Sequence, residues 1–206
     1  MSIVTLNDRA VRSVTAFGSL NTGSMVFIKK LTASSSANLS FVNGSSDVVL
    51  DSTYKEYLFT FNNIHPASAS FFQFNMSVDG GSNYNVTKTT TIFIAAHKED
   101  TDGTDFTYRT AQDLAQSTDY QKLLSYGDVG ADNDQSLSGY LQLFNPSSTT
   151  FVKHFMARTS DSDATDYQID SYIAGYGNTT SAVNAINFQM SSGDIDAGDI
   201  CLYGIL

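Results

Sequence analysis

Carboxylate side chains gather in four short segments of the chain, and carboxylates are the groups that metal or glycosidase chemistry would require. Calcium favours oxygen ligands from such loops, but none of the four segments has the spacing of an EF-hand, because no Glu closes it at the required offset. Aspartate is also frequent in turns that bind no metal. We therefore interpret the segments as turns, keep calcium as the alternative, and predict no metal site and no cofactor. The segments are Asp100/Asp102/Asp105, Asp128/Asp132/Asp134, Asp161/Asp163/Asp166 and Asp194/Asp196/Asp199.

The remaining reactive residues form no catalytic pattern. Only two glutamates, Glu56 and Glu99, join the many aspartates, and any two carboxylates could be chosen as a glycosidase pair, so this pattern identifies nothing. No Gly-X-Ser-X-Gly motif marks a nucleophilic serine. The histidines have no short metal-binding spacing. We predict that the protein is not an enzyme. The histidines are His65, His97 and His154.

The charge balance excludes some partners. The 206 residues include 11 Lys and Arg against 21 Asp and Glu, which gives a formal net charge of −10. Binding to nucleic acid through phosphates requires a basic stripe, and the chain has none, so we predict no nucleic-acid partner. No apolar run approaches 18 residues, and the first residues lack a signal-peptide pattern, so we predict no membrane partner. The single Cys201 lies in an alternating run and is interpreted as a strand residue.

Polar and apolar residues alternate along most of the chain, and this pattern predicts its fold. Because successive strand side chains point to opposite faces, each such run has one face to bury and one to hydrate. Recurrence of the runs between Gly-, Ser- and Asn-rich turns predicts an all-β, antiparallel, jelly-roll-like β-sandwich. We expect Phe72, Phe74 and Phe188 to face the core. Strands are predicted over residues 25–31, 39–42, 54–62, 70–78, 84–95, 137–144, 150–158, 167–176, 185–190 and 200–205.

Some connections are also predicted. Strands 70–78 and 84–95 are expected to form a hairpin, as are 137–144 and 150–158, while Ile64-His65-Pro66 is expected to end its strand. Residues 97–135 are predicted to form a long inserted loop region, in which residues 111–124 could form one short helix. Long insertions in compact domains are usually functional or interfacial.

Two segments stand out for their composition. Residues 1–22 are predicted to be an attachment arm or an extra strand, and residues 23–206 the sandwich domain; Arg9 and Arg12 suit pairing with carboxylates of a partner. Residues 77–84 resemble the Asp-box hairpin motif, which braces a turn and is not catalytic. We expect Asp79 to accept hydrogen bonds from the N–H groups of the turn, and Gly80 and Gly81 to supply positive φ.

Tyrosines provide the last candidates for a site. If exposed, they could stack on sugars or anchor an interface, and the interface is favoured because sugar platforms usually include Trp, which this chain lacks. These tyrosines are Tyr108, Tyr120, Tyr126 and Tyr172.

Six stretches of the chain carry a resemblance to known proteins. They are DSTYKEY (51–57), NIHP (63–66), VDGGSNY (78–84), DQSLSG (134–139), FNPSSTTFVKHF (144–155) and MSSGDIDAG (190–198). Together they resemble a family of small virion proteins of marine tailed bacteriophages, notably cyanophages. The resemblance spans about residues 24–206 and carries structural motifs, with no catalytic residues to transfer. A weaker resemblance links the segment Leu6, Asn7, Asp8, Arg9, Ala10, Val11 and Arg12 to leaders that attach such proteins to the particle.

The resemblance and the β pattern together predict a non-enzymatic structural protein located in the virion. Its expected partners are other virion proteins of the capsid or tail and further copies of itself, most simply as a trimer. Capsid decoration is the first choice. A tail fibre, collar or other tail appendage is the alternative, and so is a carbohydrate-binding module for host-surface glycans.

Overall fold

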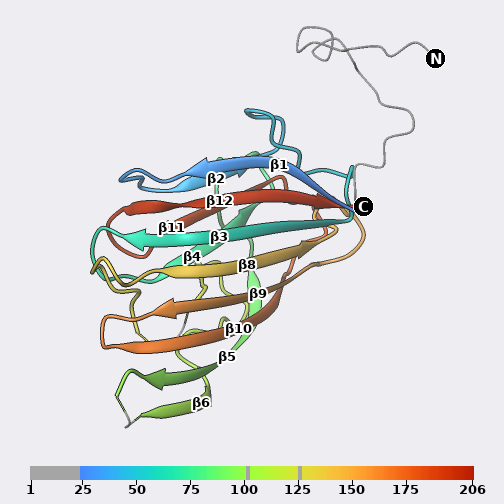
Figure 1. Ribbon diagram of the computed structural model, residues 1–206. Helices are drawn as coiled ribbons and strands as arrows, with labels where there is room; N and C mark the ends of the chain where they lie inside the picture. The colour runs from blue at the N-terminus through green and yellow to red at the C-terminus, as the bar shows by residue number, and fades with distance from the viewer. Residues whose placement is uncertain (1–23, 101–102, 125–126) are drawn as a thin grey trace, which may run out of the picture.

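The computed structural model describes residues 24–100, 103–124 and 127–206, and these form two antiparallel β-sheets that pack as a sandwich (Figure 1). The described residues contain no helix, and hence none able to cross a membrane. The antiparallel sandwich predicted from the alternation is confirmed, although its sheets are unequal. The large sheet has the order β1 (Met25–Thr32), β12 (Ile195–Ile205), β3 (Glu56–Pro66), β8 (Leu137–Phe144), β9 (Lys153–Ser162), β10 (Tyr167–Gly177), β5 (Lys88–Lys98) and β6 (Thr104–Tyr108). The small sheet has the order β2 (Leu39–Val42), β11 (Ala185–Met190), β4 (Phe72–Ser77) and β7 (Gln121–Lys122).

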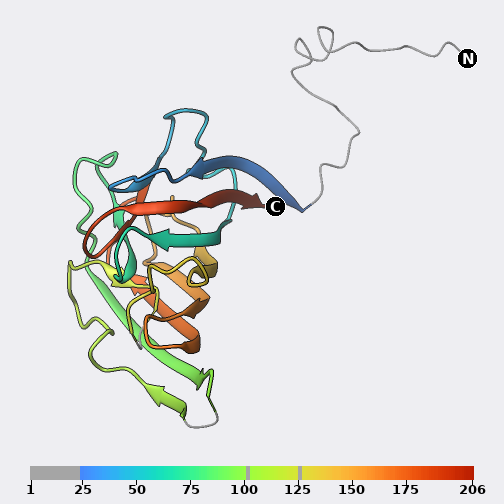
Figure 2. The same cartoon turned by 60° about the vertical axis from the view of Figure 1, so that its left-hand side comes forward.

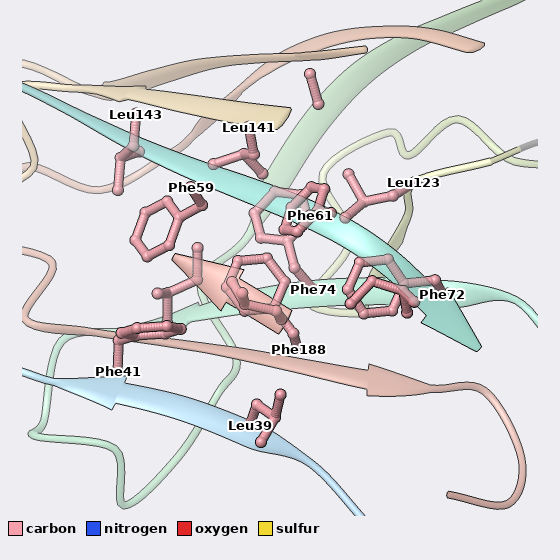
Figure 3. Packing of buried hydrophobic residues seen from close by; sticks show 14 of the residues in the cluster. Leu39, Phe41, Phe59, Phe61, Phe72, Phe74, Leu123, Leu141, Leu143 and Phe188 are labelled. Atoms are coloured by element: carbon pink, nitrogen blue, oxygen red, sulfur yellow. The ribbon is translucent and has the colours of Figure 1, made fainter. Parts of the chain in front are cut away.

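The core between the sheets is built around Phe188 of β11. Its ring lies 5.3 Å from that of Phe61 and 5.4 Å from that of Phe59, both on β3 of the large sheet (Figure 3). It also contacts Phe72 and Phe74 of the neighbouring strand β4. Phe72, Phe74 and Phe188 are completely buried, as the alternation predicts. Aromatic rings from both sheets therefore meet at one residue.

One predicted hairpin is wrong. Strands β4 and β5 are consecutive in the chain but belong to different sheets, β4 beside β11 and β7, and β5 between β10 and β6. A backbone–backbone hydrogen bond from Val86 N to Met76 O joins the connection to β4 before the chain crosses to the large sheet. The other predicted hairpin, β8 with β9, is confirmed.

Two local predictions are also corrected. Strand β3 continues through Ile64 to Pro66, because Pro66 stands at the end of the strand, where its missing N–H breaks no internal ladder. Residues 111–124 hold no helix; they lead into the short strand β7, and Leu123 and Leu124 are completely buried. The predicted insertion therefore contributes β6 to one sheet and β7 to the other.

The polar side of β4 is buried instead of hydrated. Asn75 is fully buried, and its amide nitrogen donates to the carbonyl oxygens of Tyr84 at 2.7 Å and Thr118 at 2.9 Å. Segments distant in sequence thus cover the face that alternation alone assigns to solvent.

The first prediction concerns the ring at the centre of the core. We expect Phe188→Ala to lower the free energy of unfolding by about 3–5 kcal/mol, because it removes a buried ring and leaves a cavity between the sheets. Chemical denaturation measures the loss. Phe151→Ala is the matched control, since that ring is 69% exposed and its removal should change stability little. Equal effects of the two substitutions would contradict the packing described here.

Candidate functional site

The outer face of the large sheet, defined as the side chains of its strands that point away from the core, is the strongest candidate site. Figure 2 shows how this sheet extends from β1 to the projecting strands β5 and β6. The register of the strands assigns seven of the ten exposed large hydrophobic residues of the described chain to this face. They are Met25, Phe27, Phe93, Phe106, Tyr108, Tyr140 and Met156.

A row of large side chains crosses the middle of this face. Tyr140 on β8, Arg158 on β9, Tyr172 on β10, Phe93 on β5 and Tyr108 on β6 lie opposite one another on successive strands. The rings of Phe93 and Tyr172 are stacked with centroids 4.8 Å apart and planes 2° from parallel. On the other side, the Arg158 guanidinium carbon lies 4.8 Å from the centre of the Tyr172 ring. We call these five residues the central row.

The charges within the row are neutralised in place. Arg158 donates from Nε to Asp170 Oδ1 at 2.9 Å and from Nη2 to Oδ2 at 2.7 Å, and Tyr172 Oη donates to the same Oδ2 at 3.0 Å. The hydrogen bonds from Arg158 are the main cause that lowers the pKa of Asp170, and the bond to Asp170 raises the pKa of Tyr172. The bidentate geometry fixes Arg158 against the Tyr172 ring.

The rest of the outer face also carries little net charge. Lys30 pairs with Asp199 at 3.2 Å, and Glu56 accepts a hydrogen bond from Gln142 at 2.6 Å. Together with Arg158 and Asp170, these are the charged residues that the strand register directs outward, and they sum to −1. Because the whole chain carries −10, its acidic excess lies almost entirely elsewhere.

Shallow hollows flank the central row. One, of about 250 Å³, lies between the row and the small side chains Thr91 and Ala174, with Met156 at its rim. Another, of about 460 Å³, lies on the opposite side of the row, beside Ser138 and Ser160. The face therefore consists of a ridge with a hollow along each side, a shape suited to packing against another surface.

The tyrosines singled out in the sequence have different environments. Tyr108 and Tyr172 both belong to the central row, whereas Tyr120 donates from Oη to Asn187 Oδ1 at 3.1 Å and is partly buried. Tyr126 lies outside the described residues. Both faces of the Tyr172 ring are covered, by Phe93 and Arg158, so this ring presents its edge to solvent and offers no flat surface to a sugar. Tyr140 and Phe93 were not anticipated, because only the register brings them into line.

The interpretation of the acidic segments as turns is only partly correct, because Asp105, Asp161, Asp196 and Asp199 lie within strands β6, β9 and β12. Asp163 does lie in a turn. Asp163 accepts hydrogen bonds from the backbone N–H groups of Thr165 at 2.8 Å and Tyr167 at 2.9 Å, which is the usual role of aspartate in a tight turn. Across residues 24–100, 103–124 and 127–206, no three His, Cys, Asp or Glu side chains are arranged to hold a metal ion. Asp102 lies outside this part of the chain, as do the predicted attachment residues Leu6, Asn7, Asp8, Arg9, Val11 and Arg12.

The turn at Asp79 is closed by its own side chains. Ser77 Oγ donates to Asp79 Oδ1 at 2.6 Å, and Asn83 donates its backbone N–H to the same oxygen at 2.9 Å. These hydrogen bonds lower the pKa of Asp79 to about 2, and the bond from Ser77 has the largest effect. Gly80 and Gly81 have φ of +72° and +83°.

The two glycines provide a matched pair for a second prediction. A Cβ at Gly81 would lie 2.7 Å from Tyr84 Oη, whereas a Cβ at Gly80 would meet nothing within 4 Å. Each Gly→Ala change incurs about 1–2 kcal/mol for the left-handed conformation. We expect Gly81→Ala to lower the melting temperature more than Gly80→Ala does. Equal losses would mean that Tyr84 moves aside without cost.

Lys88 and Asp161 are among the buried ionisable residues of the large sheet. Lys88 on β5 is completely buried, and its Nζ donates to Asn75 Oδ1 on β4 at 2.6 Å and to Val86 O at 2.7 Å. Burial lowers the pKa of Lys88 to about 7, and attraction to Asp119 opposes the shift. The carboxyl oxygens of Asp161 are buried and have no hydrogen-bond partner among the described residues, and burial raises the pKa of this carboxyl well above the usual value. The Lys88 bonds tie one sheet to the other, so we assign this lysine a structural role.

The third prediction follows from Lys88. Its pKa is lower in the folded protein than the 10.5 of a free lysine, so the unfolded chain binds more protons between these values. Stability should therefore fall by up to about 1.4 kcal/mol per pH unit as the pH drops from about 10 toward 7, with no further loss from this group below. Urea unfolding at several pH values measures the slope.

The control for this experiment is a second lysine variant. Lys88→Met should flatten the slope, while Lys55→Met, at an exposed position, should keep it. An unchanged slope in Lys88→Met would show that Lys88 stays protonated throughout this range.

No family model, curated protein or solved structure matches the chain. The function must therefore be inferred from the residues described above and from the resemblance noted in the sequence.

Proposed function

We propose that this chain is a non-enzymatic structural protein of a tailed-bacteriophage particle, most simply a capsid decoration protein. The six stretches that resemble small virion proteins motivate the proposal. The observation that supports it best is the outer face of the large sheet, a broad surface with exposed apolar side chains and almost no net charge.

This face has the composition of a protein interface. The cores of such interfaces are depleted in unpaired charges and enriched in Tyr, Phe, Met and Arg. The central row supplies three tyrosines, Tyr108, Tyr140 and Tyr172, with Phe93 and Arg158, and Met156 lies beside it. Large exposed apolar patches on soluble proteins commonly mark sites of association.

The proposed attachment segment would join the sandwich at its rim. Residues 1–22 precede β1, an edge strand of the large sheet, and Ser24 at its start accepts a hydrogen bond from the backbone N–H of Leu206 at 2.9 Å. The described core cluster begins only at Ile28. Contacts of residues 1–22 with a partner would thus leave the described core intact.

The alternatives differ in what they require of this surface. A tail fibre or collar component would use the same kind of apolar face, so only the position in the particle separates it from a decoration protein. A glycan-binding module would require open ring faces, and the covered faces of Tyr172 do not favour it. We retain decoration as the first choice.

The fourth prediction tests attachment. The chain with residues 1–22 deleted should melt as a folded domain but should be missing from purified particles of the phage that encodes it. Arg9→Ala combined with Arg12→Ala should also reduce incorporation, because these arginines are proposed to pair with carboxylates on the partner. Mass spectrometry of the particles measures the copies.

Lys55→Ala serves as the control for loss of a positive charge on the sandwich and should be incorporated normally. If the full chain is absent from particles at stoichiometric amounts, the virion assignment fails. If instead the deletion unfolds the protein, residues 1–22 belong to the sandwich.

A further inference from the structure

The outer face of the large sheet is wide enough to hold a stable interface by itself. Its eight strands lie about 4.8 Å apart, and at about 3.3 Å per residue most of them run for roughly 30 Å, so the face covers on the order of 1,000 Å². A stable protein interface buries about 800 Å² of each partner. The area suffices without any other part of the chain.

Electrostatic repulsion between two copies is weakest when they approach through their outer faces. Each chain carries −10, so two copies repel over most of their surface. The outer face contributes only −1, and its two ion pairs, Arg158 with Asp170 and Lys30 with Asp199, are already formed within each copy. When two copies pair through this face, four of its five charged side chains already have an oppositely charged partner within the same copy. The fifth, Glu56, accepts a hydrogen bond from Gln142.

The shape of the face allows two copies to pack against each other. The central row forms a ridge, and the hollows beside Ala174 and Ser160 flank it on the same surface. A two-fold rotation lays the ridge of one copy into a hollow of the other, and the reverse contact forms at the same time. Sheets that pack face to face stand about 10 Å apart and interdigitate their side chains in this manner.

We infer that two copies of this chain pair through the outer faces of their large sheets, with the central row of each in a hollow of the other. The pair replaces the trimer predicted from the sequence, because a face that supplies both ridge and hollow satisfies itself in a closed two-fold contact. The inference rests on the surface alone and does not depend on the virion assignment.

The test compares two Glu substitutions on neighbouring parts of one hairpin. Met156, on β9, is 54% exposed beside the central row, and Phe151 is 69% exposed in the β8–β9 connection, outside the strands that form the outer face. Neither change removes a core contact. In analytical ultracentrifugation, the full chain should sediment with twice the mass of one chain. Met156→Glu should weaken the dimer at least about tenfold, because each copy would then bury an unpaired carboxylate at the contact, and Phe151→Glu should not.

A second variant in the same interface shows whether the effect of Met156→Glu comes from the interface or from a local change in the structure of β9. Ala174→Glu, in the hollow opposite Met156 on the adjacent strand, should also dissociate the pair, with melting curves verifying that each variant is folded. A full chain that is monomeric or trimeric at all concentrations would overturn the inference. So would folded Met156→Glu and Ala174→Glu variants that dimerise normally, or a Phe151→Glu variant that dissociates equally.

Discussion

Contact between Phe188 and the rings of β3 determines how the two sheets are aligned. Phe59 and Phe61 are two residues apart, so both point inward, and a shift of β3 by one residue would replace them with Leu58 and Thr60. Because β3 pairs with β8 and β12, the choice of inward residues passes from strand to strand across the large sheet. The same choice fixes what faces outward. The central row is thus a consequence of the core: Tyr140, Arg158 and Tyr172 lie in line because their neighbours are buried.

Polar groups inside the sandwich specify the connection between β4 and β5. An apolar core would accept several arrangements of this crossing, but Lys88 requires two acceptors, and Asn75 Oδ1 and Val86 O provide them from opposite ends of the connection. Asn75 in turn uses its amide nitrogen to hold the carbonyls of Tyr84 and Thr118. Leaving any of these groups unbonded would cost free energy in the dry interior. One lysine and one asparagine therefore position segments from residues 84 to 118.

Alternation in the sequence was sufficient to predict the class of fold and the buried positions of Phe72, Phe74 and Phe188, since both depend on local period alone. It failed where strand partners had to be chosen: residues 70–78 and 84–95 look like a hairpin, yet Lys88 and Ile92 join the large sheet. The short strands β6 and β7 were missed because their residues acquire strand pairing only from β5 and β4. Of the central row, the sequence pointed only to Tyr108 and Tyr172, because the five residues of the row come from five strands and no local pattern links them.

The outer face also departs from the usual pattern of an antiparallel sheet. Such sheets bury one face and hydrate the other, so outward positions are normally polar. Here the outward positions of β9 and β5 include Met156 and Phe93, while Ser160 and Thr91 keep the space beside them open. Stacking of Phe93, Tyr172 and Arg158 then holds the side chains in one arrangement before any partner arrives. A surface that is already ordered loses less conformational entropy on binding, and that reduces the cost of association. The row thus stabilises the sheet from outside and presents a preformed surface for association.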